Sequence, residues 1–169
     1  MIIRDEQPAD IPAIFEVNRL AFESTVEPEL VDKLRASGKA TLSLVAEDEG
    51  QVVGHILFSP ARIESPAGVV AVMALGPLAV LPGRQRQGIG SALVRAGLKQ
   101  LRNDGARICI LEGSPQYYPR FGFMDALPLE ITCQFEAPPG CFMVAELQPG
   151  ALAGVNGKAY YAEEFQSMG

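Results

Sequence analysis

Apolar and polar positions follow two different periods along the chain, and the change of period separates predicted helices from predicted strands. From residue 8 to residue 22, apolar side chains recur at helical spacing, and Pro8 suits a first helical turn. Residues 69–80 form a longer apolar run without that spacing, which is typical of a strand. The pattern predicts helices over residues 8–22, 28–37 and 88–103, and strands over 42–47, 51–63, 69–80, 108–111 and 142–147, the last being the final strand.

Turn residues connect these elements in an order that favours one domain. Asp48, Glu49 and Gly50 have the chemistry of a hairpin turn between two predicted strands. No repeat or linker interrupts the chain, so we expect residues 1–169 to form a single α+β domain around a mixed sheet. Residues 148–169 are expected to pack on it as an ordered C-terminal extension, because they carry scattered apolar and aromatic side chains: Ala151, Leu152, Val155, Tyr160, Tyr161 and Phe165.

Composition restricts the classes of partner. Of 169 residues, 48% are apolar and 20% charged, which is typical of a soluble globular domain. The opening MIIRDEQPAD resembles no signal peptide and no apolar run is long enough to cross a bilayer, so a cytoplasmic protein without a membrane partner is expected. The net charge of -6 argues against nucleic acid and is compatible with a cationic substrate.

The metal-ligating and redox residue types are sparse. Cys109, Cys133 and Cys141 are odd in number and lack CxxC spacing, so reduced, packed thiols are expected. The one histidine, His55, has no cluster around it that could complete a metal site. No metal is therefore expected.

A glycine pair, Gly88 and Gly90, marks the point where a polar loop becomes a predicted helix. Such a loop lets a ligand approach the backbone closely, and the free amides of a first helical turn favour an anion such as phosphate. A P-loop would need lysine where Ile89 stands, and a dinucleotide fingerprint would need glycine where Leu93 stands. Both nucleotide-binding alternatives, including a nucleotide hydrolase, are therefore disfavoured.

The same loop fits a different phosphate-binding signature. The stretch from Gln85 to Gly90, QRQGIG, resembles the Q/R-x-x-G-x-G/A signature of the GNAT superfamily of N-acetyltransferases. The strand before it contains Gly76-Pro77, which is expected to interrupt pairing with a neighbouring strand and open a gap. In LEGSPQYYPRFGF, the spacing from Tyr118 to Gly122 also matches this superfamily. With the opening DIPAIFEVNRLAF and the tail MVAELQPGALAGVNGKAYY, nearly the whole chain resembles its bacterial YhbS-like group.

The resemblance implies a fold and a cofactor site. It implies the GNAT fold, a mixed and mostly antiparallel central sheet that is splayed at the acetyl-CoA cleft and flanked by helices. Acetyl-CoA would be the cosubstrate, its pantetheine arm hydrogen-bonded to backbone like an added strand. Pantetheine and acetyl would contact Leu78, Ala79 and Val80, and the pyrophosphate would lie against Gln85, Arg86, Gln87, Gly88, Ile89 and Gly90 at the positive end of the helix dipole.

The implied reaction is direct transfer of acetyl to a primary amine within a ternary complex. Tyr118 would protonate the departing thiolate, with Tyr117 beside it on an extended segment pointing the other way, and Phe121 and Phe123 as core residues. The amide of Leu78 could stabilise the oxyanion.

Three further residues are candidates with ordinary alternatives. Glu112 could deprotonate the amine through water, although a glutamate at a strand end is commonly just exposed or a cap. Glu23 and His55 could contact the substrate, although Glu23 also suits a solvated loop and His55 a core position.

Several features of the reaction and its partners stay open. A relay through Cys109 has no base beside it in the sequence. The alternative function is a non-catalytic acyl-CoA-binding sensor or interaction module. Small-molecule and protein amines are both possible acceptors, and a monomer or a homodimer is possible.

Overall fold

A computed structural model describes residues 1–168, and the chain forms two compact units. The first unit contains Met1–Ser59 and Leu75–Lys99 together with Met168, and the second contains Pro60–Ala74 and Gln100–Ser167. Strands β3 (Gln51–Ser65) and β4 (Gly68–Val80) are neighbours, and each runs from one unit into the other. The single-domain interpretation of the sequence stays a prediction.

The first unit combines one edge of the sheet with the helices. Strand β1 (Ile2–Asp5) pairs antiparallel with β2 (Leu42–Asp48), and β2 pairs antiparallel with β3. The short helix η1 (Pro8–Asp10) leads into α1 (Ile11–Phe22), which α2 (Val26–Ala36) follows. After β4 come η2 (Pro82–Arg84) and α3 (Ile89–Asn103), whose last turn belongs to the second unit. All three predicted helices are confirmed, with ends that differ by a few residues.

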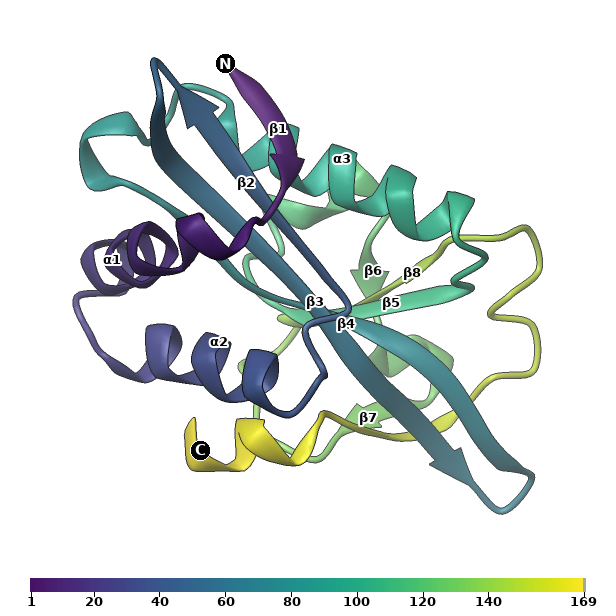
Figure 1. The fold of residues 1–169 in the computed structure, drawn as a ribbon. Helices are drawn as coiled ribbons and strands as arrows, with labels where there is room; N and C mark the ends of the chain where they lie inside the picture. Colours follow the sequence, from purple (N-terminus) through teal and green to yellow (C-terminus); the bar gives the residue numbers. More distant parts are fainter. Residues whose placement is uncertain (169) are drawn as a thin grey trace. The chain divides into compact units, whose positions relative to one another are not determined.

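Strand β3 is buried on both faces in the first unit, which explains its continuous apolar run. Its side chains alternate, so His55 points to one face while Gly54 and Phe58 point to the other. His55 meets Asn18 of α1, whereas a Cβ on Gly54 would lie 3.0 Å from Ile89 and Leu93 of α3. Helices therefore cover both faces here, with α1 and α2 on one side and α3 on the other (Figure 1).

The second unit contains the other edge of the sheet. Strand β4 pairs parallel with β5 (Ile108–Glu112), β5 pairs antiparallel with β8 (Phe142–Glu146), and β8 pairs antiparallel with β6 (Met124–Asp125). Strand β9 (Gly157–Tyr160) pairs antiparallel with β3 and parallel with β7 (Ile131–Cys133). Three short helices follow β5 in the chain: η3 (Tyr118–Phe121), η4 (Leu127–Leu129) and η5 (Glu163–Met168). The predicted mixed, mostly antiparallel sheet with helices is confirmed.

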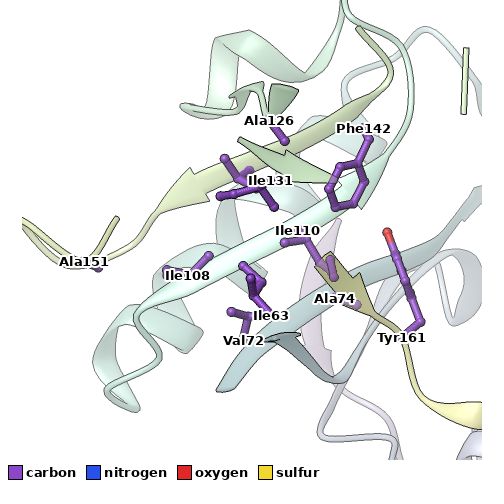
Figure 2. Packing of buried hydrophobic residues seen from close by; sticks show 12 residues of the cluster. Ile63, Val72, Ala74, Ile108, Ile110, Ala126, Ile131, Phe142, Ala151 and Tyr161 are labelled. Atoms are coloured by element: carbon purple, nitrogen blue, oxygen red, sulfur yellow. The ribbon is translucent and has the colours of Figure 1, made fainter. Parts of the chain in front are cut away.

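A cluster of buried apolar residues fills the second unit. It joins Val72 and Ala74 of β4 to Ile108 and Ile110 of β5, and it includes Tyr161, which follows β9 (Figure 2). In the second unit, Ala151, Ala159 and Tyr161 are buried, while the expectation of a packed extension over residues 148–169 stays a prediction.

One prediction about strands is wrong, and several short strands were missed. The sequence pattern gave residues 142–147 as the final strand, but β9 follows it. Strands β6, β7 and β9 were not predicted, because they span two to four residues and are too short to display a period of two.

No described helix is both long and apolar enough to cross a membrane.

Candidate active site

The predicted phosphate loop lies in the first unit and is shaped by backbone hydrogen bonds. The amide of Leu81 donates to the carbonyl of Val53 on β3 at 2.9 Å, so the end of β4 is fixed. The amide of Arg84 donates to the carbonyl of Leu81 at 2.8 Å and closes the turn of η2. The chain is extended again at Gln85, with φ -70° and ψ 159°, before it enters α3.

Gly88 has a backbone conformation that favours glycine. Its φ is +85°, in the left-handed region where side chains are strained, and a Cβ built there would meet no heavy atom within 4 Å. The constraint at this position is therefore the backbone conformation rather than a protein neighbour. Arg86, two residues before Gly88 in the same exposed loop, is also left-handed, with a φ of +63°.

The start of α3 presents backbone donors at the predicted position. The amide of Ala92 donates to the carbonyl of Gly88 at 3.0 Å, so Ile89 and Gly90 precede this helical hydrogen bond. Ile89 is only 3% exposed, because its side chain packs toward β3 and anchors the helix start. The free amides of a helix start favour an anion, and phosphate binding at this position stays a prediction.

Side chains of the loop form hydrogen bonds that stabilise it. Arg84 donates to Asp48 at 2.6 Å and, more weakly, to Gln87 at 3.2 Å. This ion pair holds the pKa of Asp48 below its ordinary value. Gln85 donates from Nε2 to the carbonyl of Val80 at 3.1 Å, so this signature glutamine ties the loop to the end of β4.

The part of β4 expected to contact pantetheine also lies in the first unit. Ala79 is 2% exposed, whereas Leu78 and Val80 are half-buried. The register between β4 and β5 places Met73 opposite Cys109 and Ala74 opposite Ile110, so this pairing ends before Gly76. That agrees with the expected interruption at Gly76-Pro77, while the splayed cleft itself stays a prediction.

Tyr118 lies in the second unit, at the first position of η3, packed in a small aromatic cluster. Its ring contacts those of Tyr117, Phe121 and Phe123, with centroids 5.0, 6.2 and 5.9 Å away. Phe121 and Phe123 are buried, which confirms their predicted core role. A Cβ on Gly113 would lie 2.9 Å from Cδ2 of Tyr118, so this glycine makes room for the ring. Gly113 was not predicted as part of the site, although its place directly after a buried strand was an available signal.

Burial changes the acidity of Tyr118. It raises the pKa of the Tyr118 hydroxyl to about 12, with a smaller contribution from Tyr117. The hydroxyl therefore stays protonated at neutral pH and is a weaker acid than a free tyrosine. It is well suited to donate a hydrogen bond to developing negative charge.

The neighbouring Tyr117 does not point away as expected. Its backbone is helical, with φ -101° and ψ -51°, so the expectation of an extended segment with opposed side chains is wrong. The two rings meet edge to face instead, and Arg120 lies 4.6 Å above the ring of Tyr117. Tyr117 is therefore part of the same aromatic cluster and packs directly against Tyr118.

Two acidic candidates lie on the surface. Glu112 ends β5, where its backbone stands opposite Phe142, and its side chain is exposed. Glu23 caps α1 with a left-handed φ of 52°, and its amide donates to the carbonyl of Arg19. The local role of Glu23 is thus the helix end, and its substrate role stays a prediction.

His55 is unsuited to the substrate contact that we expected. The side chain is fully buried and both ring nitrogens have partners: Nδ1 lies 3.1 Å from Asn18 Nδ2, and Nε2 lies 2.9 Å from Ser43 Oγ. Ser43 donates its proton to Glu6 at 2.7 Å, so His55 donates from Nε2 and accepts at Nδ1. Burial lowers the pKa of His55 to about 4, so the ring is neutral and structural.

The remaining polar chemistry is limited. Cys109, Cys133 and Cys141 form no disulfide, and Cys109 is buried. Within residues 1–168, no group of three metal-ligating side chains could hold a metal ion.

Comparison with known proteins identifies the family. Residues 2–126 match the model of the acetyltransferase (GNAT) domain. The uncharacterized N-acetyltransferase YhbS of Escherichia coli K12 is 39% identical over 166 residues, covering 98% of each chain.

Two solved structures agree in sequence and in fold. The crystal structure of YhbS from Escherichia coli, in complex with CoA, has a TM-score of 0.92 at 37% identity and covers 99% of this chain and 93% of that one. A GNAT family acetyltransferase from Brucella melitensis, in complex with acetyl-CoA, has a TM-score of 0.80 at 40% identity, with 97% of each chain covered. The chain is therefore a GNAT-fold acyltransferase and belongs to the GNAT acetyltransferase domain family.

Proposed function

We propose that the protein transfers acetyl from acetyl-CoA to a primary amine by direct attack in a ternary complex. The observation that carries this proposal is the loop from Gln85 to Gly90, with Gly88 left-handed at φ +85° directly ahead of the start of α3. The backbone there can approach a pyrophosphate closely, and two relatives were solved with CoA and acetyl-CoA. Leu78, Ala79 and Val80 would bind pantetheine, with the Leu78 amide at the oxyanion.

Tyr118 would assist departure of CoA. The acceptor nitrogen attacks the thioester carbon, the C–N bond forms and the C–S bond breaks, leaving a thiolate whose thiol has a pKa of about 8.5. A hydroxyl with a pKa of about 12 gives its proton only partly to such a thiolate, so Tyr118 acts as a strong hydrogen-bond donor during C–S cleavage. As the amide forms, the acceptor nitrogen releases one proton, so the products are the amide, the CoA thiolate and that proton.

Glu112 would receive that proton through water. It is an exposed carboxylate at the end of β5, and no cation among the described residues pairs with it. It therefore keeps its accepting oxygens for an incoming group. Reaction with acetyl-CoA and reduced cysteines both suit the cytoplasm.

An acceptor screen tests this function. The purified full chain is incubated with acetyl-CoA and a panel of alkylamines, amino acids, aminoglycosides and peptides, and free CoA thiol is measured. Amine-dependent thiol release that Tyr118→Phe lowers would support the proposal. Acetyl-CoA binding without release for any member would favour the sensor, and no acetyl-CoA binding would overturn both functions.

A further inference from the structure

An ion pair in the first unit links the turn between β2 and β3 to the predicted phosphate loop, and the proposed reaction gives it no role. Nη2 of Arg84 donates to Oδ2 of Asp48 at 2.6 Å. The two side chains are only 32% and 28% exposed, so the pair is partly shielded from solvent. Salt therefore screens it less than it screens a pair on the open surface.

The sheet fixes the position of Asp48. This residue ends β2 and stands opposite Gln51 in the register, so only Glu49 and Gly50 connect the two strands. Both connecting residues are left-handed, with φ of 51° and 77°, which is the conformation of a tight two-residue hairpin turn. The backbone that presents the Asp48 carboxylate is therefore held by the strands on either side of it.

The guanidinium of Arg84 also reaches the residue before Gly88. Its Nε donates to Oε1 of Gln87 at 3.2 Å, and Gln87 directly precedes Gly88 in the chain. Two of the three side-chain nitrogens of Arg84 are thus engaged within the protein. A chain of contacts runs from Asp48 through Arg84 to Gln87, so it connects the hairpin turn to the left-handed residue of the loop.

Strand β3 contacts the same segment at two further points. The amide of Leu81 donates to the carbonyl of Val53 at 2.9 Å. A Cβ on Gly54 would lie 3.0 Å from Ile89, so glycine there lets α3 begin close to the strand. The hairpin therefore contacts this segment at its start and at its end, and the ion pair is the contact between them.

We propose that Asp48 is a positioning residue for acetyl-CoA: through Arg84 it holds the loop in the conformation that presents its backbone amides to the pyrophosphate. Arg84 serves as the link between Asp48 and the loop rather than as a ligand of the phosphates. This inference rests on the proposed function, because it takes the loop from Gln85 to Gly90 as the pyrophosphate site.

The proposal predicts an effect whose sign is opposite to that of simple charge. Removal of a carboxylate near a pyrophosphate relieves repulsion, which by itself strengthens binding. Loss of the ion pair instead releases Arg84 and the turn beside Gly88, so we expect weaker binding. Glu49 is the matched control, because it carries the same charge in the same turn, is exposed and has no partner among the described residues.

Calorimetric titration of the full chain with acetyl-CoA tests the pair as a unit. We expect about 3- to 10-fold weaker binding in Asp48→Asn and in Arg84→Gln, because a charge-assisted hydrogen bond is lost. The double variant should bind no more weakly than either single variant, since all three lack the same pair. Glu49→Gln should bind at least as tightly as the wild type.

Observation of Arg84 itself separates positioning from phosphate contact. In the chain labelled with ¹⁵N-arginine, Arg84→Gln assigns the Nε–H signal of Arg84. We expect this signal to shift in Asp48→Asn and to stay in place when acetyl-CoA saturates the wild type. A large shift on acetyl-CoA binding would show that Arg84 contacts the phosphates, and it would overturn the inference.

Three calorimetric results would also overturn it: unchanged or tighter binding in Asp48→Asn, an equal loss in Glu49→Gln, or losses that add in the double variant. Additive losses would mean that Asp48 acts apart from Arg84, since its Oδ1 also lies 3.6 Å from the amino group of Met1.

The variant Gly88→Val keeps the two proposals apart. Normal acetyl-CoA affinity in Gly88→Val would overturn the proposed pyrophosphate site. Weakened binding in Gly88→Val beside normal binding in Asp48→Asn would overturn the positioning role of Asp48 alone.

Discussion

The loop from Gln85 to Gly90 and the segment from Gly113 to Phe123 use glycine in opposite ways. Gly88 has open space around a would-be Cβ and a left-handed φ of +85°, so glycine there serves the backbone and the ligand. Gly113 would place a Cβ against the ring of Tyr118, so glycine there serves a neighbouring side chain. The first region is built for binding by main-chain groups, and the second holds one side chain in place. Substitutions should therefore separate affinity from turnover.

The largest effect is expected from Tyr118→Phe. The ring and its aromatic contacts remain, so acetyl-CoA affinity should be unchanged, while kcat falls about 10²- to 10⁴-fold, since a hydrogen-bond donor to the leaving group is lost. Because the pKa of Tyr118 is about 12, wild-type activity should show no loss from ionisation of this hydroxyl between pH 6 and pH 10. Steady-state kinetics across pH 6–10 measure both.

Tyr117→Phe is the matched control for that variant. Its ring lies beside Tyr118 and should be kept, so kcat should change little. A large loss in Tyr117→Phe with a normal Tyr118→Phe would show that the wrong tyrosine has been assigned.

Gly88→Val should affect binding instead. Valine is strained at φ +85° and its side chain would fill the open space beside the loop, so we expect about 10- to 100-fold weaker acetyl-CoA binding by calorimetry, equivalent to about 1–3 kcal/mol. Gly83→Ala is the control, because Gly83 also has open space around its Cβ but no left-handed φ, and its affinity should be near normal. Equal affinities in the two variants would contradict the backbone role of Gly88.

The buried histidine gives the first unit a pH response of its own. The pKa of His55 is lowered from 6.5 to about 4, so below pH 6.5 the unfolded chain takes up a proton that the folded chain does not. The free energy of unfolding should therefore fall as pH falls, by about 2 kcal/mol between pH 6.5 and pH 5. Denaturant titrations at both pH values should show this difference in the wild type and not in His55→Gln. An equal change in the free energy of unfolding in the two proteins would contradict this role of His55.

The smallest effect is expected from Gly113→Ala. The added methyl displaces the Tyr118 ring, so kcat should fall about 10-fold or less while acetyl-CoA affinity is kept, since misplacement of a group costs less than its removal. Weaker acetyl-CoA binding together with normal kcat would contradict the role of Gly113 in placing the Tyr118 ring.

Features with local causes could be predicted from the sequence. The long helices and strands have clear periods, and the glycine signature marks a backbone conformation set within a few residues, as Gly88 shows. The family resemblance was confirmed for the same reason, since its motifs are contiguous.

Features set by contacts between distant segments could not. His55 looked equally suited to core and substrate until Asn18 and Ser43 were seen to occupy its ring nitrogens. The surroundings of Tyr161 could not be predicted, because its place depends on β7 and β9, which are too short to predict. The helical turn at Tyr117 was also missed, although its cause is local: the amides of Tyr117 and Tyr118 both donate to the carbonyl of Ser114.

The central claim is that the loop ahead of α3 binds the pyrophosphate of acetyl-CoA. Calorimetric titration of the full chain with acetyl-CoA, and separately with ATP, tests it most directly. We expect saturable binding of acetyl-CoA at one site, markedly weakened by Gly88→Val and retained by Gly83→Ala. Saturable binding of ATP with no binding of acetyl-CoA would contradict the account.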